Sequence, residues 1–245
     1  MRTRRRTTRI GREITLEIPA LIFSRMDSSR LPGKATKMLA GTPVLTRVIN
    51  RLRPAKEIDD IIVCTSDRDV DDPIAQLAAK AGARVFRGDA EDVLGRALAA
   101  AKGTQAVVRI SGDSVFIDPR LVDWLIVKHR RLRPDLTTNV YPRTYPPGMS
   151  VEVISTTALL DAAQKATDPL DREHVTTYFY RNDDRYVIDN VASPELMTDV
   201  DLALDTSDDF AFQSRLAPLI SESADLIQIV LEARRLNAEM MEPTC

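Results

Sequence analysis

The sequence lacks any apolar run as long as the roughly 20 residues that a membrane-spanning helix requires. Its N-terminus, MRTRRRTTRIGRE, also lacks the apolar segment of a secretory signal. Cysteine is scarce, and Cys64 and Cys245 provide neither a disulfide framework nor the spacing of a metal site. We therefore expect a cytoplasmic protein with no membrane partner, no structural disulfide and no cysteine-bound metal.

Glycine is also scarce, with nine residues in 245, and no glycine-rich phosphate-binding motif is complete. The pattern G-x-x-x-x-G-K-[ST] fits at Gly33 and Lys34, but Ser28 and Ala35 occupy its first glycine and its hydroxyl position. The dinucleotide pattern G-x-G-x-x-G is absent. A phosphate group would therefore be bound by side chains and not by backbone N–H groups alone.

Charge is distributed unevenly along the chain. Six arginines and no acid precede Glu13, so a net charge of −2 for the whole chain leaves −8 on residues 13–245. An arginine-rich tail can bind nucleic acid, but this one has no interleaved aromatic residues. We therefore interpret residues 1–17 as a disordered basic extension, expect no nucleic-acid partner, and assign residues 18–245 to one domain.

Short β-branched segments alternate with segments of helical period through the first half of the chain. The strand candidates are PALIF, DIIVCT, RVFRG and QAVVRIS, and helical segments separate them. This alternation predicts a mostly parallel sheet flanked by helices. Thr42 and Pro43 are expected as N-cap and first residue of the first helix, and Gly82 and Gly103 as left-handed C-caps of later helices.

The second half predicts a mixed sheet region, because its strand candidates are less regularly separated by helices. These candidates are LTTNV, SVEVI, YVIDNV and VDLALD, and the helix candidates include STTALLDAAQKA and DREHVTTYFYRN. The last helical segment, ESADLIQIVLEARRLNAEMM, would permit a homodimer. We expect an α/β fold with a mixed, mostly parallel central sheet, and we expect His129 to be solvated.

The segment SRMDSSRLPGK, residues 24–34, follows the first strand candidate and concentrates anion-binding groups. Arg25, Arg30 and Lys34 supply positive charge, and Ser28 supplies a hydroxyl. In α/β sheets ligands bind beyond the carboxyl ends of strands, where guanidinium and ammonium groups can neutralise phosphates. The segment predicts a triphosphate site, and a solvated charged face is the alternative interpretation.

Two carboxylates occupy comparable places after later strand candidates. Asp113 follows Gly112 after QAVVRIS, and Asp205 ends VDLALD. Carboxylates at the carboxyl ends of strands are suitable ligands for a hard cation such as Mg²⁺. The alternative is that Asp113 only stabilises a turn. Asp208 and Asp209 are expected in the first turn of the following helix.

One known family shares seven segments with residues 19–212 in the same order, namely SRMDSSRLPGKATKMLAGTPVLTRVINRL, IIVCTSDRDVDDPIAQLA, VFRGDAEDVLGR, VVRISGDSVFIDPRLVD, PRTYPPGMSVEVIS, DPLDREHVTTYFYRN and LALDTSDDF. In these segments the chain resembles the SpsF-type cytidylyltransferases, relatives of the acylneuraminate and 3-deoxy-manno-octulosonate cytidylyltransferases. The resemblance implies a single Rossmann-like nucleotidyltransferase domain of the glycosyltransferase-A type. It also implies Mg²⁺-dependent transfer of CMP from CTP to an acidic sugar or related small anionic acceptor, with release of pyrophosphate.

The resemblance also implies roles for individual residues. Catalysis would fall to Arg30, Lys34 and Asp113, and Mg²⁺ would be held by Asp113 and Asp205. The nucleotide would be bound by Ser24, Arg25, Ser28, Arg30, Lys34, Thr65, Ser66, Asp67 and Gly112. The acceptor would be bound by Arg143, Glu152, Arg172, Glu173 and His174. For His174, a packing or surface role is the alternative.

The sequence departs from the family pattern at three places. Asp27 replaces a glycine in the first loop, Ser114-Val115-Phe116 replaces Cys-Pro-Leu, and Ser150 replaces an aspartate. The last change places a neutral hydroxyl in the acceptor segment. Two other functions therefore stay open, namely a sugar-phosphate or phosphonate nucleotidylyltransferase and a non-catalytic nucleotide-binding protein.

Overall fold

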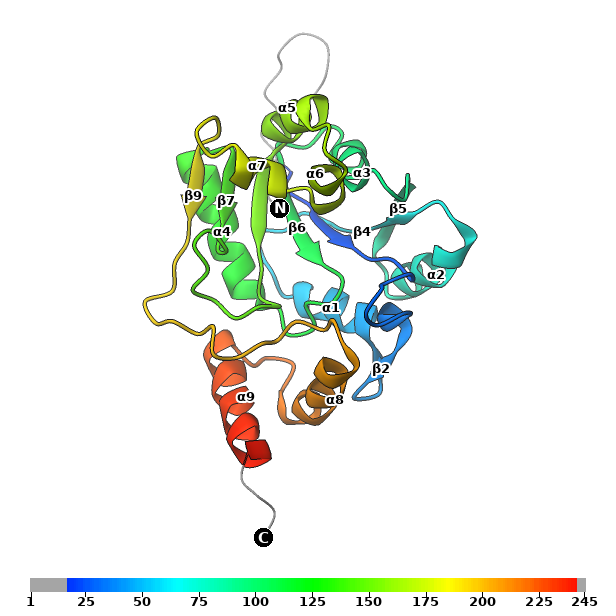
Figure 1. Cartoon of the computed structure of the whole chain (residues 1–245), viewed down its shortest axis with the longest axis vertical. Coiled ribbons are helices and arrows are strands. Elements are labelled where there is room, and N and C mark those ends of the chain that lie inside the picture. The colour runs from blue at the N-terminus through cyan, green and yellow to red at the C-terminus, as the bar shows by residue number, and fades with distance from the viewer. Residues whose placement is uncertain (1–16, 242–245) are drawn as a thin grey trace, which may run out of the picture.

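The computed structural model describes residues 17–241, so Cys245 and the predicted basic extension, apart from Glu17, lie outside the described residues. Its centre is a seven-stranded sheet with the order β5-β4-β1-β6-β8-β7-β9 (Figure 1). The strands are β1 (Ala20–Phe23), β4 (Ile61–Ser66), β5 (Arg84–Gly88), β6 (Ala106–Ser111), β7 (Leu136–Thr138), β8 (Glu152–Ser155) and β9 (Ile188–Asn190). A separate hairpin joins β2 (Met38–Leu39) and β3 (Thr42–Pro43).

The sheet is mostly parallel and contains one antiparallel strand, which confirms the predicted mixed α/β architecture. Strand β1 pairs in parallel with β4 and β6, and β4 pairs in parallel with β5. Strand β8 is antiparallel to β6 and β7, and β9 is parallel to β7. The four parallel strands β5, β4, β1 and β6 therefore present their carboxyl ends at one edge of the sheet.

Helices cover both faces of the sheet, and Figure 1 shows α5 and α9 at opposite ends of the molecule. The helices are α1 (Val44–Leu52), α2 (Asp72–Lys80), α3 (Val93–Ala100), α4 (Pro119–Leu132), α5 (Thr156–Lys165), α6 (Pro169–His174), α7 (Thr177–Arg181), α8 (Ser207–Leu216) and α9 (Leu226–Met241), with 3-10 helices η1 (Lys34–Thr36), η2 (Asp69–Asp71) and η3 (Ala217–Leu219). None of the helices within residues 17–241 is both long and apolar enough to cross a membrane.

Two hydrophobic clusters, one on each face, hold the helices to the sheet. Side chains of a strand alternate between faces, so Ala20 and Ile22 of β1 enter one cluster and Leu21 enters the other. The first cluster includes residues of α1, α2, α4 and α9, and the second includes residues of α3, α5 and α7. The central strands are therefore buried on both faces, which is why they read as continuous apolar runs.

Local capping signals agree in part with the structure. Gly82 and Gly103 both have positive φ after their helices, as predicted. Helix α1 begins one residue later than predicted, because Pro43 is its N-cap and Thr42 belongs to β3. Asp208 and Asp209 lie in the first turn of α8, which confirms their predicted place.

Residues 200–205, VDLALD, do not form the predicted strand. The N–H of Leu202 donates to Pro147 O (3.0 Å), and Gln213 Nε2 donates to Leu202 O (3.0 Å) and Ala203 O (2.8 Å). These partners belong to a loop and a helix, and no sheet ladder forms. Leu202 and Leu204 are fully buried, so the alternating apolar pattern reflects burial of an extended segment and not membership of the sheet.

His129 is buried, contrary to the prediction that it is solvated. It lies one helical turn beyond Leu125 and Ile126 on the packed face of α4, and it is 2% exposed. Its Nδ1 lies 3.1 Å from the Thr137 hydroxyl of β7. Burial lowers the pKa of His129 to about 4, against a smaller opposing effect of Asp189, so the imidazole is neutral near pH 7.

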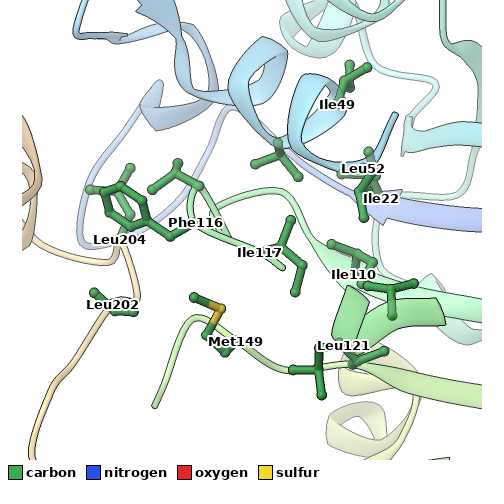
Figure 2. Packing of buried hydrophobic residues seen from close by; sticks show 14 of the residues in the cluster. Ile22, Ile49, Leu52, Ile110, Phe116, Ile117, Leu121, Met149, Leu202 and Leu204 are labelled. Carbon is green, nitrogen blue, oxygen red and sulfur yellow. The ribbon is translucent and has the colours of Figure 1, made fainter. Parts of the chain in front are cut away.

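The larger cluster extends past the sheet to the loops at its carboxyl edge. Figure 2 shows side chains of this cluster from three loops, namely Phe116, Ile117, Met149, Leu202 and Leu204, and all five are fully buried. Polar residues stand close to these anchors in the sequence, at positions 113, 150 and 205. The loops that carry these polar residues are therefore fixed by the core beneath them.

Candidate active site

A cavity of about 450 Å³ opens where β1 and β6 end. Eleven residues predicted from the sequence line it, namely Ser24, Arg25, Ser28, Arg30, Lys34, Gly112, Asp113, Arg143, Glu173, His174 and Asp205. Five other predicted residues do not, namely Thr65, Ser66, Asp67, Glu152 and Arg172. The fold therefore gathers most of the predicted groups into one space.

The basic loop, residues 24–34, is held in shape by backbone bonds. The N–H of Gly33 donates to Met26 O (2.8 Å), and Gly33 has a φ of 68°, in the left-handed region that glycine adopts without a steric penalty. The buried carboxylate of Asp71 accepts from Met26 N–H (2.7 Å) and from the Ser66 hydroxyl of β4. These bonds tie the basic loop to the sheet at the mouth of the cavity.

Lys34 lies at the centre of a charged cluster. Its Nζ contacts a carboxylate oxygen of Asp113, lies 3.1 Å from Asp205 Oδ1, and donates to Leu204 O (3.0 Å). Arg30 pairs with the other carboxylate oxygen of Asp205 at 2.8 Å. Two cations and two carboxylates from three loops therefore form one ion-pair network in the wall of the cavity.

Gly112 allows the loop after β6 to approach the basic loop. Its N–H donates to Phe23 O (2.8 Å), and a Cβ at this position would lie 2.7 Å from that oxygen and 2.8 Å from Ser24 Cβ. Such distances are shorter than a side chain tolerates, so the close approach requires glycine. Asp113 is thereby held beside the basic loop.

A capping box at the start of α8 fixes the backbone around Asp205. Thr206 is the N-cap, and its hydroxyl accepts from Asp209 N–H (3.2 Å). In return, Asp209 Oδ2 accepts from Thr206 N–H (2.7 Å) and Asp205 N–H (2.9 Å). Leu204 is anchored in the core on the other side (Figure 2). Asp205 is therefore held from both directions along the chain.

Glu173 and His174 reach the cavity from the end of α6. Val175 follows with a φ of 57° and a ψ of −59°, and Thr176 N–H donates to His174 O (2.5 Å), which makes a γ-turn of the rare, strained type. Val175 itself is buried in the second cluster. This reversal ends α6 at the cavity, where Glu173 pairs with Arg25 at 2.8 Å.

Arg143 and Ser150 line the cavity from the loop before β8, together with Gly148. Arg143 Nη2 donates to the Ser150 hydroxyl (3.1 Å). Burial lowers the pKa of Arg143, and the guanidinium still carries its charge at pH 7. Gly148 has a φ of 84°, and a Cβ there would lie 2.3 Å from backbone atoms of Leu202. The loop before β8 therefore packs closely against the segment that leads to Asp205.

Glu152, which was predicted to bind the acceptor, does not line the cavity. It is 2% exposed, and its two oxygens accept from Arg109 Nη1 (2.6 Å) and from the Tyr180 hydroxyl (2.5 Å). Burial, and secondarily Glu152, raise the pKa of Tyr180, so the phenol stays protonated and donates this bond. Glu152 thus balances the charge of Arg109, a cavity residue that was not predicted from the sequence.

Thr65, Ser66 and Asp67, which were predicted to contact the nucleotide, do not line the cavity. Thr65 and Ser66 are buried in β4, and the Ser66 hydroxyl is engaged by Asp71. Asp67 N–H donates to Gly88 O (3.0 Å) beyond the end of β5. Ser66 contributes to the site only indirectly, because it helps Asp71 to hold the basic loop.

Arg172, which was predicted to bind the acceptor, joins helices and does not line the cavity. Its Nη1 donates to Ala163 O (3.1 Å) and Ala166 O (3.0 Å), and its Nη2 pairs with Asp92 at 2.6 Å. Asp92 is the N-cap of α3. Arg172 therefore connects α6 to the end of α5 and to the start of α3.

Arg96 is a second cavity residue that was not predicted from the sequence. It is 5% exposed, its Nη1 donates to Asp89 O (2.5 Å), and its buried Nε has no partner among the described residues. Burial lowers the pKa of Arg96. It lies three residues after Val93, so both residues face the cavity from one side of α3.

The departures from the family pattern have different structural meanings. Asp27 pairs with Arg68 (2.7 Å) and Arg25 (3.5 Å) outside the cavity, so its charge is compensated there. In the replaced tripeptide, Ser114 lines the cavity while Phe116 packs in the core. Ser150 is the departure whose side chain both lines the cavity and contacts a cation.

Asp113 and Asp205 fit a divalent-cation site that is completed by a ligand. Within residues 17–241, no three His, Cys, Asp or Glu side chains come close enough together to hold a metal ion by themselves. Mg²⁺ is commonly bound by one or two protein carboxylates together with substrate phosphates and water. Two carboxylates that meet at one ammonium group, in a cavity lined by cations, match that requirement.

A mixed α/β sheet with a cationic loop and two carboxylates at the carboxyl edge of its parallel strands defines the class of nucleotidyltransferases. The profile of the family described as Cytidylyltransferase matches residues 19–238. The chain belongs to the cytidylyltransferase family, as its sequence segments predicted.

Individual relatives agree with this assignment. The chain is 31% identical over 219 residues to the spore coat polysaccharide biosynthesis protein SpsF of Bacillus subtilis (strain 168), covering 86% of this chain and 90% of SpsF. A cytidylyltransferase structure from Leptospira borgpetersenii serovar Hardjo-bovis (strain JB197) has a TM-score of 0.88 at 26% identity, covering 94% of this chain and 99% of that one. A CMP:2-keto-3-deoxy-manno-octonic acid synthetase complexed with CTP shares the fold, with a TM-score of 0.62 at 18% identity over 83% of this chain and 100% of that one.

Proposed function

We propose that the protein transfers CMP from CTP to an acidic sugar or a related small anionic acceptor, in a Mg²⁺-dependent reaction. The observation that carries this proposal is the meeting of Arg30, Lys34, Asp113 and Asp205 in one cavity. Cations suit a triphosphate, and paired carboxylates suit its metal ion. Membership of the cytidylyltransferase family supports cytosine as the base.

In the proposed reaction an acceptor hydroxyl oxygen bonds to the α-phosphorus of CTP. The bond from that phosphorus to the bridging oxygen breaks, pyrophosphate leaves with its electron pair, and the hydroxyl proton passes to solvent. Arg30 and Lys34 stabilise the charge of the departing pyrophosphate, while Ser24, Arg25 and Ser28 bind the nucleotide.

Asp113 and Asp205 would hold Mg²⁺, which supplies charge neutralisation and orientation of the phosphates when bound. Gly112 keeps Asp113 at this place, and the α8 capping box does the same for Asp205. On the acceptor side, Arg143, Glu173 and His174 line the same cavity. The protein thus contributes mainly positioning and fixed charge to the reaction.

Nucleotide binding tests the proposal before the acceptor is known. The thermal midpoint is measured with CTP, UTP, GTP, ATP and dTTP, with and without Mg²⁺, on the wild type and Asp113→Asn. A nucleotide at about 100 times its Kd stabilises the folded protein by about 2.7 kcal/mol. Of the five nucleotides, we expect only CTP to raise the thermal midpoint. Mg²⁺ should enlarge this rise in the wild type and not in Asp113→Asn. Asp199→Asn, which changes an exposed ion pair with Arg234, is the matched control and should behave as the wild type.

Pyrophosphate release then tests the reaction. With an acceptor present, Asp113→Asn should lower turnover by about 10²- to 10³-fold, the usual cost of removing one stabilising group. Mg²⁺-dependent turnover near the wild-type rate in Asp113→Asn would rule out the metal assignment. Stabilisation by UTP, GTP or dTTP in place of CTP would favour a sugar-phosphate nucleotidylyltransferase, and stabilisation by none would favour a non-catalytic protein.

A further inference from the structure

The cationic side chains of the cavity differ in whether a carboxylate balances them. Four of the six lysines and arginines that line it are paired, namely Arg25 with Glu173, Arg30 with Asp205, Lys34 with Asp113 and Asp205, and Arg109 with Glu152. The other two, Arg96 and Arg143, have no carboxylate within 4.0 Å among residues 17–241. A cation left unbalanced in a cavity is a candidate binding group for an anion.

Arg143 is the unbalanced cation that a ligand can reach. Arg96 is almost fully buried and donates to a backbone carbonyl, whereas Arg143 is half-buried. The Arg143 guanidinium has five N–H donors, and its bonds within the described residues go to Ser150 Oγ (3.1 Å) and to Pro146 O (3.4 Å). Glu152, the nearby carboxylate, is already engaged by other side chains. Donors of Arg143 therefore remain for a ligand.

The loop that presents Ser150 to Arg143 is held rigidly. Buried Asn139 donates from Nδ2 to Met149 O (2.8 Å) and accepts at Oδ1 from Val151 N–H (2.9 Å), so it holds the residues on both sides of Ser150. A guanidinium and a hydroxyl are thus placed side by side before any ligand binds. Such preorganisation lowers the cost of binding a small anion.

We propose that Arg143 and Ser150 bind an oxyanion of the acceptor, and that the neutral side chain at position 150 determines specificity for anionic acceptors. The inference rests on the proposed function and deepens it. A carboxylate at position 150 would pair with Arg143 and repel the acid group of a ligand, whereas the serine leaves the positive charge to the ligand and adds a hydroxyl donor. The acceptor therefore carries a carboxylate or a phosphonate in addition to its attacking hydroxyl.

Three small compounds of matched structure test this site. Glycolate and hydroxymethylphosphonate share a hydroxymethyl group and differ in the acid, and ethylene glycol is the uncharged control. Each is titrated into the full chain at constant ionic strength, with saturating CTP and no divalent cation, and again without CTP. The thermal midpoint is measured for the wild type, Arg143→Gln, Ser150→Asp and Ser150→Asn, the last being as large as the Asp variant but neutral.

In the wild type we expect stabilisation by at least one of the two anions and none beyond solvent effects by ethylene glycol. Ser150→Asp and Arg143→Gln should weaken apparent anion affinity by about ten- to a hundredfold, the range for hydrogen bonds to charged groups. Ser150→Asn should bind the anion at least about tenfold more tightly than Ser150→Asp, because its side chain has nearly the same size, carries no charge and can donate an N–H to the anion. Stronger binding of glycolate assigns a carboxylic acid acceptor, and stronger binding of hydroxymethylphosphonate assigns a phosphonate.

Two results would overturn the inference: wild-type anion affinity in Ser150→Asp, or no stabilisation of the wild type by either anion. Each variant is first titrated with CTP alone, and an unchanged CTP response shows that the variant is folded. That titration also separates the two proposals. Failure of CTP to stabilise any form removes the proposed function, while the effect of position 150 on anion binding is still read in the titrations without CTP.

Discussion

Among single residues, buried His129 links stability to pH. Burial lowers its folded-state pKa to about 4, and an ordinary histidine in the unfolded chain has a pKa of about 6.5. Between these values the unfolded chain binds a proton that the folded protein does not. The free energy of unfolding therefore falls as the pH falls from about 6.5 to about 4, by about 3 kcal/mol in all.

Urea unfolding of the wild type and His129→Gln between pH 4 and pH 7 measures this effect. We expect the wild type to lose more stability on acidification than His129→Gln, because the variant lacks the titrating group. Equal slopes for the wild type and His129→Gln would show that His129 does not control this pH range.

Single site residues also differ in whether the sequence alone identifies them. Arg25, Arg30 and Lys34 could be found because their charges cluster in one loop directly after a strand. Arg96 and Arg109 were missed because each is a lone cation within an apolar helix or strand segment, where its direction depends on tertiary packing. A cluster of charges can be recognised in the sequence, whereas the inward direction of a single arginine is known only from the folded structure.

At the scale of elements, the contact between the Gly148 loop and the segment before Asp205 makes a testable prediction. Gly148→Ala would place a Cβ 2.3 Å from the backbone of Leu202, at a residue with a φ of 84°. Gly41→Ala is the matched control, because Gly41 also has positive φ (78°) but its Cβ would meet nothing within 4 Å.

Thermal or urea unfolding of the two glycine variants separates backbone strain from the clash. We expect Gly41→Ala to cost about 1–2 kcal/mol from the left-handed conformation alone. Gly148→Ala should cost about 3 kcal/mol or more, since overpacking adds about 1–3 kcal/mol. Equal losses in the two variants would mean that the loop moves away from Leu202 without a penalty.

Helices and strands were predicted well where the periodic pattern of apolar residues coincides with backbone hydrogen bonds of a helix or a sheet. The central strands and their helices follow from the alternation in the first half of the chain. Strands β7 and β9 lie within predicted strand segments, and β8 overlaps SVEVI and ends one residue after it. VDLALD failed as a strand because alternation reports burial of every second side chain, and an extended segment buried against a loop produces the same pattern. DREHVTTYFYRN was predicted as helical, but the strained turn at Val175 interrupts it. Valine rarely adopts the positive φ of this turn, so the sequence gives no sign of the interruption.

At the scale of the whole molecule, the described lining of the cavity lies further along the chain than the N-terminal arginines. Among residues 17–241, the lining residues run from Phe23 to Asp205, and residues 2–12 lie outside this range. We expect a chain shortened by removal of residues 2–12 to be stabilised by CTP and Mg²⁺ as strongly as the full chain, in parallel thermal titrations. A weaker CTP response in the shortened chain would assign the six N-terminal arginines to the nucleotide site.

The strand order divides the cavity between two stretches of the chain. Strands β1 and β6 lead into the basic loop and Asp113, while the loop between β7 and β8 carries Arg143 and Ser150. Under the proposed function, acceptor choice depends on the loop between β7 and β8, while the residues for phosphate chemistry, Asp205 included, lie in other segments. Mutations in the loop between β7 and β8 can therefore alter the acceptor during evolution while the residues that activate the nucleotide stay unchanged.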